Sequence, residues 1–241
     1  MKELQFHKTT LLCACTLLLA ACQTTDSTGS TAKERAAKID SAMQRAALNA
    51  NRSGQTGKSL AVLEKIYKRN TDSEEAALNY AAALRRNNYL NRASTVLEPF
   101  VTSKDASTYA KSEFAAIMLA RGEYKIAEGY AKQAVELDDK NPLAYHYLGV
   151  ALDTQGEYES AERAFRKGLE LWQGDPTSIM NNLALNLAAQ EELDEAAEIL
   201  QSARELSPNR REIERNLRII TALQQTRVID IPKPGRKPER S

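Results

Sequence analysis

Glycine, proline and aromatic residues are all scarce in this sequence. Its 241 residues include ten glycines and seven prolines, and aromatic side chains make up 6% of the total. Glycine and proline disfavour helix most strongly, whereas alanine, leucine, glutamate, lysine and arginine, which are abundant here, favour it. The composition therefore predicts helix over most of the chain and an all-α fold, and it excludes glycine-rich or proline-rich fibrous proteins.

An excess of charge of one sign is also missing. Lysine and arginine together number 33 and aspartate and glutamate 32, so the formal net charge is +1. Nucleic-acid-binding domains usually carry a strong basic excess. We therefore expect no nucleic-acid partner.

Long hydrophobic runs are absent as well. The most apolar stretch, TTLLCACTLLLAA at residues 9–21, is far shorter than the roughly 20 residues of a membrane-spanning helix. It follows a weakly basic start that contains Lys2 and Lys8 and ends in small residues. This pattern is typical of a signal peptide. We predict a signal peptide over residues 1–21.

The end of the apolar run carries the motif Leu19-Ala20-Ala21-Cys22. It resembles the bacterial lipobox, and the resemblance implies that Cys22 is lipidated and becomes the mature N-terminus. The alternatives are a plain secretory signal without lipid and an upstream box ending at Cys15. The upstream box is disfavoured because only residues 9–12 would precede it as an apolar segment. In such lipoproteins a residue other than Asp after the cysteine, here Gln23, implies the outer membrane, at its periplasmic face. Residues 22–31 are predicted to be the lipidated cysteine and a flexible tether.

Chemically reactive side chains become rare once the signal peptide is removed. All three cysteines lie within residues 13–22, and His7 is lost, which leaves His146 as the sole histidine. Neither a disulfide nor a two-histidine metal site can then form within one chain. The sequence also lacks the G-x-S-x-G, H-E-x-x-H, P-loop and G-x-G-x-x-G motifs. We predict no catalytic residue, no metal site and no cofactor, and a protein that is not an enzyme.

What the sequence does contain is an internal repeat. GEYKIA at residues 122–127 recurs as GEYESA at residues 156–161, which is 34 residues later. A step of 34 residues back from Gly122 reaches Asn88, and a further step reaches Gly54. A step of 35 residues forward from Ala161 reaches Ala196. The period is therefore kept over most of the chain.

This period and the pattern of one repeat resemble the tetratricopeptide repeat (TPR), a helix–turn–helix unit of 34 residues. The pattern is clearest in NPLAYHYLG at residues 141–149, followed by Gly156, Tyr158, Ala161 and Phe165. The resemblance predicts an α-solenoid of five repeats at about 40–73, 74–107, 108–141, 142–176 and 177–210. One more amphipathic helix, residues 211–225, is predicted to cap the stack. The predicted TPR domain spans residues 32–225, and residues 226–241 are predicted to be a disordered basic tail.

The family resemblance also implies a binding surface. In TPR arrays, positions 2, 5, 6, 9, 12 and 13 of each repeat line a concave groove that binds a protein or peptide client. The predicted partner-binding residues are Leu78, Asn79, Arg85, Arg86, Tyr109, Leu119, Leu143, His146, Val150, Asn182 and Leu185. The arginine pair is either solvated or oriented toward an acidic residue or the C-terminal carboxylate of the client. For Asn182, a hydrogen bond to an adjacent helix is as strongly indicated as contact with a client. Trp172 is predicted to be either an exposed contact or a lid on its hairpin.

The predicted chain consists of a signal peptide, a lipobox, a tether, the repeats and an end helix. This plan is similar to that of pilus-assembly lipoproteins, and most similar to the TadD family of the Tad/Flp pilus system. The run Glu214-Arg215-Asn216-Leu217 adds to this resemblance. It implies a pilotin-like scaffold or chaperone that serves a secretin or another assembly component. The alternative is a general periplasmic adaptor that docks peptidoglycan enzymes.

Overall fold

The computed structural model describes residues 26–229, and side chains are described from residue 34 to residue 226. Within these residues all regular secondary structure is helical, and no helix is long and apolar enough to span a membrane. The helices are α1 (Asp26–Arg52), α2 (Thr56–Arg69), α3 (Glu74–Arg86), α4 (Leu90–Val101), α5 (Thr108–Arg121), α6 (Tyr124–Leu137), α7 (Pro142–Asp153), α8 (Tyr158–Leu171), α9 (Thr177–Ala189), α10 (Leu193–Leu206) and α11 (Arg211–Ile229). Cys22 and residues 230–241 lie outside the described residues.

The chain divides into two compact units, residues 1–66 and residues 67–241. In the first unit, α1 begins at Asp26 and therefore includes residues 26–31, which the sequence predicted to be part of a flexible tether. The difference has a physical cause, because extending an established helix costs far less than starting one. The alanine-rich segment that follows residue 31 supplies that established helix. In the same way α11 continues to Ile229, four residues into the predicted tail.

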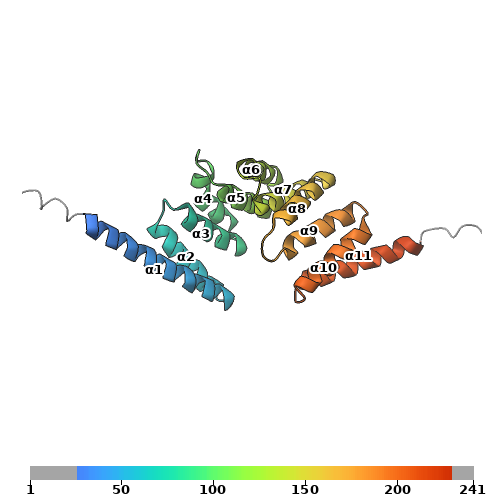
Figure 1. The fold of residues 1–241 in the computed structure, drawn as a ribbon, viewed down its shortest axis with the longest axis horizontal. Helices are drawn as coiled ribbons and strands as arrows, with labels where there is room; N and C mark the ends of the chain where they lie inside the picture. Colours follow the sequence, from blue (N-terminus) through green and yellow to red (C-terminus); the bar gives the residue numbers. More distant parts are fainter. Residues whose placement is uncertain (1–25, 230–241) are drawn as a thin grey trace, which may run out of the picture. The chain divides into compact units, whose positions relative to one another are not determined.

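The second unit is a stack of helical hairpins. Each helix from α3 to α10 contacts the next one in the chain, and the first helices of successive hairpins also contact one another, from α3 to α5, α7, α9 and α11 (Figure 1). Four hairpins therefore follow one another in this unit, and α11 closes the stack against α9 and α10. Together with α1 and α2, this arrangement confirms the predicted five helix pairs and a capping helix.

The turn inside each hairpin keeps the period found in the sequence. Gly122 and Gly156 have left-handed backbone conformations, with φ of 79° and 80°. The equivalent residues Asn88 and Glu191 are also left-handed, with φ of 61° and 65°. Asparagine tolerates this conformation better than most residues, but glutamate does not. The turn geometry is thus imposed by the packing of the two helices rather than by glycine alone.

Small residues stand where helices cross. Ala93, Ala127, Ala161 and Ala196, spaced by 34, 34 and 35 residues, are all completely buried. Gly149 has a related role, because a Cβ atom there would lie 2.6 Å from the ring of Phe165, which is itself almost fully buried. Alanine and glycine at these positions let the helices approach closely enough for the core of larger side chains to form.

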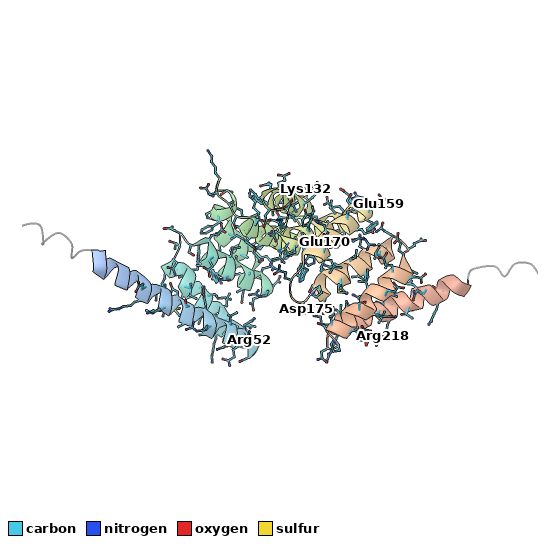
Figure 2. The ribbon with its side chains drawn as sticks, viewed as in Figure 1. Arg52, Lys132, Glu159, Glu170, Asp175 and Arg218 are labelled. Atoms are coloured by element: carbon cyan, nitrogen blue, oxygen red, sulfur yellow. The ribbon has the colours of Figure 1, made fainter. Side chains whose placement is uncertain are left out.

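A repeating polar contact joins the hairpins at their second helices. The carboxylate of Glu128 on α6 accepts hydrogen bonds from Lys132 (2.6 Å) and from Gln155, which follows α7 (3.0 Å). One repeat later, Glu162 accepts from Arg166 (2.8 Å) and Gln190 (3.0 Å). The hydrogen bond from Lys132 lowers the pKa of Glu128 to about 2, although burial acts in the opposite direction. Figure 2 labels Lys132 beside α6. We call these two groups the carboxylate brackets.

Candidate functional site

The candidate site is the surface formed in the second unit by the first helices of its hairpins, α3, α5, α7 and α9, and by α11, which we call the A-helix face. All of the predicted partner-binding residues lie on these helices, and each keeps some exposure to solvent. Asn79, Arg86, Tyr109 and Leu185 are exposed. The others are half-buried, and they are Leu78, Arg85, Leu119, Leu143, His146, Val150 and Asn182. None belongs to the buried core, so these side chains are placed where a partner could reach them.

The N-terminal half of this face, on α3 and α5, is built around an ion pair. Arg85 donates from Nε to Oε1 of Glu113 (2.7 Å) and from Nη2 to Oε2 (3.2 Å). Burial lowers the pKa of Arg85, but the hydrogen bonds and charge of Glu113 outweigh it, so the pKa lies above its ordinary value. Burial raises the pKa of the neighbouring Tyr147, and the charge of Glu113 adds to this. Three successive first helices thus meet in one polar cluster.

The two arginines of the predicted basic pair are not equivalent. The charge of Arg85 is neutralised by a bidentate carboxylate within the fold. Arg86 is exposed, and no carboxylate among residues 34–226 lies within ion-pair distance of it. Of the two, Arg86 alone retains an unpaired cation for a partner, so the basic feature predicted for this end of the face is reduced to one side chain.

His146 on α7 is enclosed by aromatic side chains. Its ring stacks on Tyr147, with centroids 5.4 Å apart, and meets the edge of Trp172 at 5.6 Å. Burial lowers the pKa of His146 to about 4, so the imidazole is neutral near pH 7. Trp172 itself is half-buried, and its Nε1 donates to the carbonyl oxygen of Asp175 (3.0 Å). Of the two alternatives for Trp172, the structure supports the lid.

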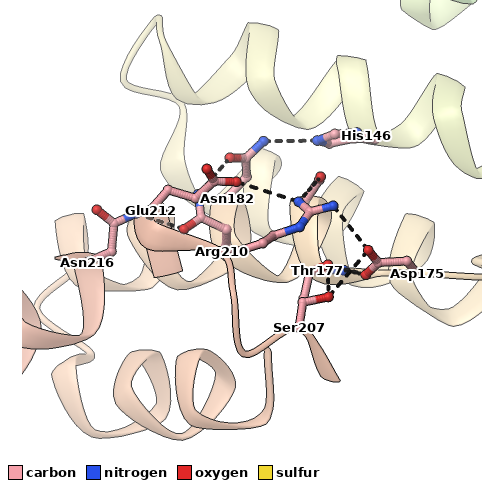
Figure 3. A network of polar contacts seen from close by, with 10 residues as sticks. His146, Asp175, Thr177, Asn182, Ser207, Arg210, Glu212 and Asn216 are labelled. Atoms are coloured by element: carbon pink, nitrogen blue, oxygen red, sulfur yellow. Dashed lines mark hydrogen bonds and ion pairs between the residues drawn. The ribbon is translucent and has the colours of Figure 1, made fainter. Parts of the chain in front are cut away.

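A chain of side-chain hydrogen bonds continues from His146 across the next two first helices (Figure 3). Asn182 on α9 bonds to Nε2 of His146 (2.9 Å) and accepts from Asn181 (3.4 Å). Asn181 in turn accepts from Nδ2 of Asn216 on α11 (2.7 Å), and Asn216 accepts from Arg215 (3.3 Å). We call this series the amide chain. Asn182 therefore does bond to an adjacent helix, which was one of its two predicted alternatives.

A second polar cluster fixes the loops beside the amide chain. Asp175 accepts from the backbone nitrogen of Thr177 (3.0 Å) at the start of α9 and from Arg210 (3.0 Å) just before α11. Ser207 adds a longer contact to the same carboxylate (3.4 Å). Figure 3 shows Asp175, Thr177, Ser207 and Arg210 drawn together from two loops. These contacts set the ends of α9 and α11, and therefore the spacing of the amide chain.

Sequence reasoning missed three residues of the face. Glu113 follows the predicted Asn79 by 34 residues, Asn216 follows Asn182 by 34, and Ile219 follows Leu185 by 34. Ile219 is 52% exposed and extends the apolar surface onto α11. The period alone contained the signal for all three. For Asn216 and Ile219 the period extends into α11, which the sequence predicts only as a cap, whereas Glu113 occupies the sixth position of its own repeat on α5.

Comparison with known proteins agrees with this geometry. Two family models, each described as a tetratricopeptide repeat, match residues 118–176 and 177–207. The chain is a TPR solenoid. No curated protein sequence matches it.

Solved structures share the fold at low sequence identity. The thermophilic TPR protein TTC0263 of Thermus thermophilus aligns with a TM-score of 0.67 and 18% identity, over 76% of this chain and 99% of that one. The APC/C hetero-tetramer Cut9–Hcn1 aligns with a TM-score of 0.68 and 14% identity, over 76% of this chain but only 36% of that one. MamA of Desulfovibrio magneticus RS-1 aligns with a TM-score of 0.52 and 21% identity, over 71% and 96%. TPR solenoids are scaffolds for protein–protein interaction, and this chain has that fold.

The chemistry of the A-helix face suits binding. The described side chains between residues 34 and 226 include no cluster of three or more histidine, cysteine, aspartate or glutamate residues that could hold a metal ion. The face instead offers aliphatic side chains, carboxamides and a neutral imidazole, which form non-covalent contacts with a polypeptide.

Proposed function

We propose that this protein is a membrane-anchored scaffold that holds a protein partner on its A-helix face, as an assembly factor of a pilus or secretion system. The observation that carries the proposal is the exposure of Tyr109 and Leu185, at 59% and 42%, at positions that hairpin packing does not use. Both residues lie on first helices, α5 and α9, where an exposed apolar side chain is available to a partner. Binding of a partner, rather than catalysis, is therefore the activity that we assign to this face.

The proposed anchor is the lipid on Cys22, with the scaffold at the periplasmic face of the outer membrane. The lipobox-like motif and the signal-peptide pattern support it. Several acyl chains bind a bilayer stably, because each buried methylene contributes about 0.8 kcal/mol. The pilus role is supported by the similarity in plan to TadD-like lipoproteins and by the R-N-L run at Arg215.

Replacing Cys22 with serine is expected to release the protein from the membrane or leave its signal peptide uncleaved, because the acyl chains supply the anchoring free energy. Cell fractionation with immunoblotting measures this directly. Cys15→Ser is the matched control and should leave both processing and membrane association unchanged. If Cys22→Ser protein still sediments with outer membranes after washing without detergent, the anchor lies elsewhere in the chain.

Site-specific photo-crosslinking tests the partner role. A photoreactive phenylalanine analogue placed at Tyr109 or at Leu185 should give a discrete adduct with another protein in intact cells, because both side chains project from the A-helix face. The same analogue at Leu206, which is 59% exposed at the end of α10, is the control and should give no such adduct.

The identity of the captured protein decides the role. A secretin or pilus-assembly component supports the assembly factor, whereas a peptidoglycan enzyme would replace it with the adaptor alternative. Adducts from Leu206 alone, or from none of the three positions, would remove the A-helix face as the partner site.

A further inference from the structure

Positive charge is concentrated in the first two helices of the chain. Residues 26–69, which contain α1, α2 and the turn between them, include nine lysines and arginines and four aspartates and glutamates, a net charge of +5. Residues 70–229, which contain α3 to α11, include 18 basic and 25 acidic residues, a net charge of −7. The near-neutral total of the whole chain therefore comes from two regions of opposite sign.

One face of α1 carries an exposed row of basic residues. Lys38, Arg45 and Arg52 follow one another at intervals of seven residues, which is close to two helical turns, so they lie in one row along the helix. All three are exposed, and so are Ser41 and Leu48 between them. Figure 2 labels Arg52 at the end of this helix. We call Lys38, Arg45 and Arg52 the basic stripe.

The carboxylates of α1 and α2 do not interrupt the basic stripe. Glu34 is exposed one turn before its first member. Asp40 is half-buried on another side of α1, because it follows that first member by two residues and two residues turn a helix by about 200°. Glu64 is half-buried on α2, where Lys58 and Lys65 are exposed. The exposed charge of these two helices is therefore predominantly positive.

The helix that carries the stripe begins close to the proposed lipid anchor. Three residues of the sequence separate Cys22 from Asp26, where α1 begins. Four steps of extended chain span at most about 14 Å, so the first residue of α1 must lie within that distance of the lipidated cysteine. Charges interact with an anionic bilayer over about a Debye length, roughly 8 Å at physiological ionic strength. The anchor therefore brings the start of α1 to a distance comparable with this range.

We infer that the basic stripe of α1 lies against anionic phospholipid headgroups of the membrane that holds the lipid on Cys22, as a second contact beside the acyl chains. This rests on the proposed lipid anchor and adds the chemistry of the bilayer surface that the protein recognises. Each lysine or arginine beside an anionic surface increases membrane partitioning about fivefold, so three contribute roughly 100-fold. Leu48, which is 59% exposed next to the stripe, can insert between the headgroups. The acidic region of residues 70–229 gains no attraction from the same surface.

Fluorescence quenching in vesicles tests the inference with the mature, lipidated protein. Cys13 and Cys15 belong to the predicted signal peptide and the thiol of Cys22 is the proposed lipid attachment, so a cysteine introduced by Ser41→Cys can be labelled alone. A nitroxide on the lipid headgroups should quench this fluorophore at least about twofold more in phosphatidylcholine vesicles with roughly one third phosphatidylglycerol than in pure phosphatidylcholine. The difference should disappear in about 1 M salt, where the Debye length is about 3 Å.

Charge reversal provides the variant and its matched control. Replacing all three residues of the basic stripe with glutamate should reduce quenching in the phosphatidylglycerol vesicles to the level found in pure phosphatidylcholine. The control reverses three exposed basic residues outside α1 and α2, with Lys104→Glu, Lys140→Glu and Arg211→Glu, and should leave quenching unchanged. Circular dichroism melting should show that both variants are folded like the parent protein.

Three outcomes overturn the inference, and they differ in what they say of the proposed function. Equal quenching at residue 41 in both kinds of vesicle would leave the lipid anchor in place but exclude recognition of anionic headgroups. Equal loss of quenching in both charge-reversed variants would assign the effect to net charge rather than to α1. A protein that enters neither kind of vesicle would have no lipid anchor, which would remove that part of the proposed function together with the inference.

Discussion

Lowering the pH from 6.5 to 4 is expected to remove about 2–3 kcal/mol from the free energy of unfolding, with His146 as the cause. Its pKa is about 4 in the folded protein and 6.5 ordinarily, so the unfolded chain binds the proton more tightly. The contribution of neutral His146 is complete above pH 6.5 and is lost as the pH falls toward 4. Urea unfolding at a series of pH values measures it.

His146→Gln provides the control for this prediction. A glutamine can still bond to Asn182 but has no proton to gain, so the variant should show a flatter stability profile between pH 6.5 and 4. Glu128, whose pKa is lowered from 4.5 to about 2, begins to lose its own contribution below about pH 4.5, and it does so equally in both proteins, so the difference between them reports His146. Trp172, the sole tryptophan, lies edge-on to the imidazole and gives a second readout by fluorescence. Equal pH dependence in both proteins would show that His146 stays accessible to protons in the fold.

Replacing Phe165 with alanine is expected to cost about 3–5 kcal/mol of stability. The ring is 1% exposed and lies against Gly149, whose lack of a side chain leaves the space that the ring fills. Removing it leaves a void between α7 and α8 that helices anchored in neighbouring hairpins cannot easily close. Chemical unfolding followed by circular dichroism measures the change.

Tyr158→Ala on the same helix is the matched comparison, because Tyr158 is 40% exposed. It should change stability by less than about 1 kcal/mol, as surface substitutions usually do. Comparable losses in both variants would mean that α8 is held by its surface rather than by the core residue.

The fold could be predicted from the sequence because the period of 34 residues is carried by small residues. Ala127 and Ala161 mark helix crossings, and Gly122 and Gly156 mark turns, and each has a steric reason that is visible in the sequence. The long α1 was not predicted, because its first turn contains serine, threonine and glycine, which favour a tether in isolation. The helix that follows them in the structure overrides that local preference.

The candidate site was predicted less completely, for a different reason. The position of a residue within its repeat predicts that its side chain lies on the A-helix face. It does not predict whether a residue of the neighbouring repeat neutralises the charge of that side chain. Arg85 and Glu113 lie 28 residues apart, and their pairing depends on the spacing of α3 and α5. The low pKa of His146 likewise comes from burial, and one of the rings around the imidazole is Trp172, from an inserted turn outside the repeat pattern. Such contacts between repeats are set by packing, and the period alone does not encode them.

The carboxylate brackets and the amide chain lie at different places on the same hairpins, and this has a consequence for binding. Glu128 and Glu162 tie second helices to the end of the following first helix, while Asn181 and Asn182 tie successive first helices to one another. The junction between the α7–α8 and α9–α10 hairpins has both kinds of contact, which restricts the rotation of one hairpin against the other. In the proposed function this part of the scaffold would therefore lose little conformational entropy on binding, and most of the entropic cost of ordering would fall on the partner.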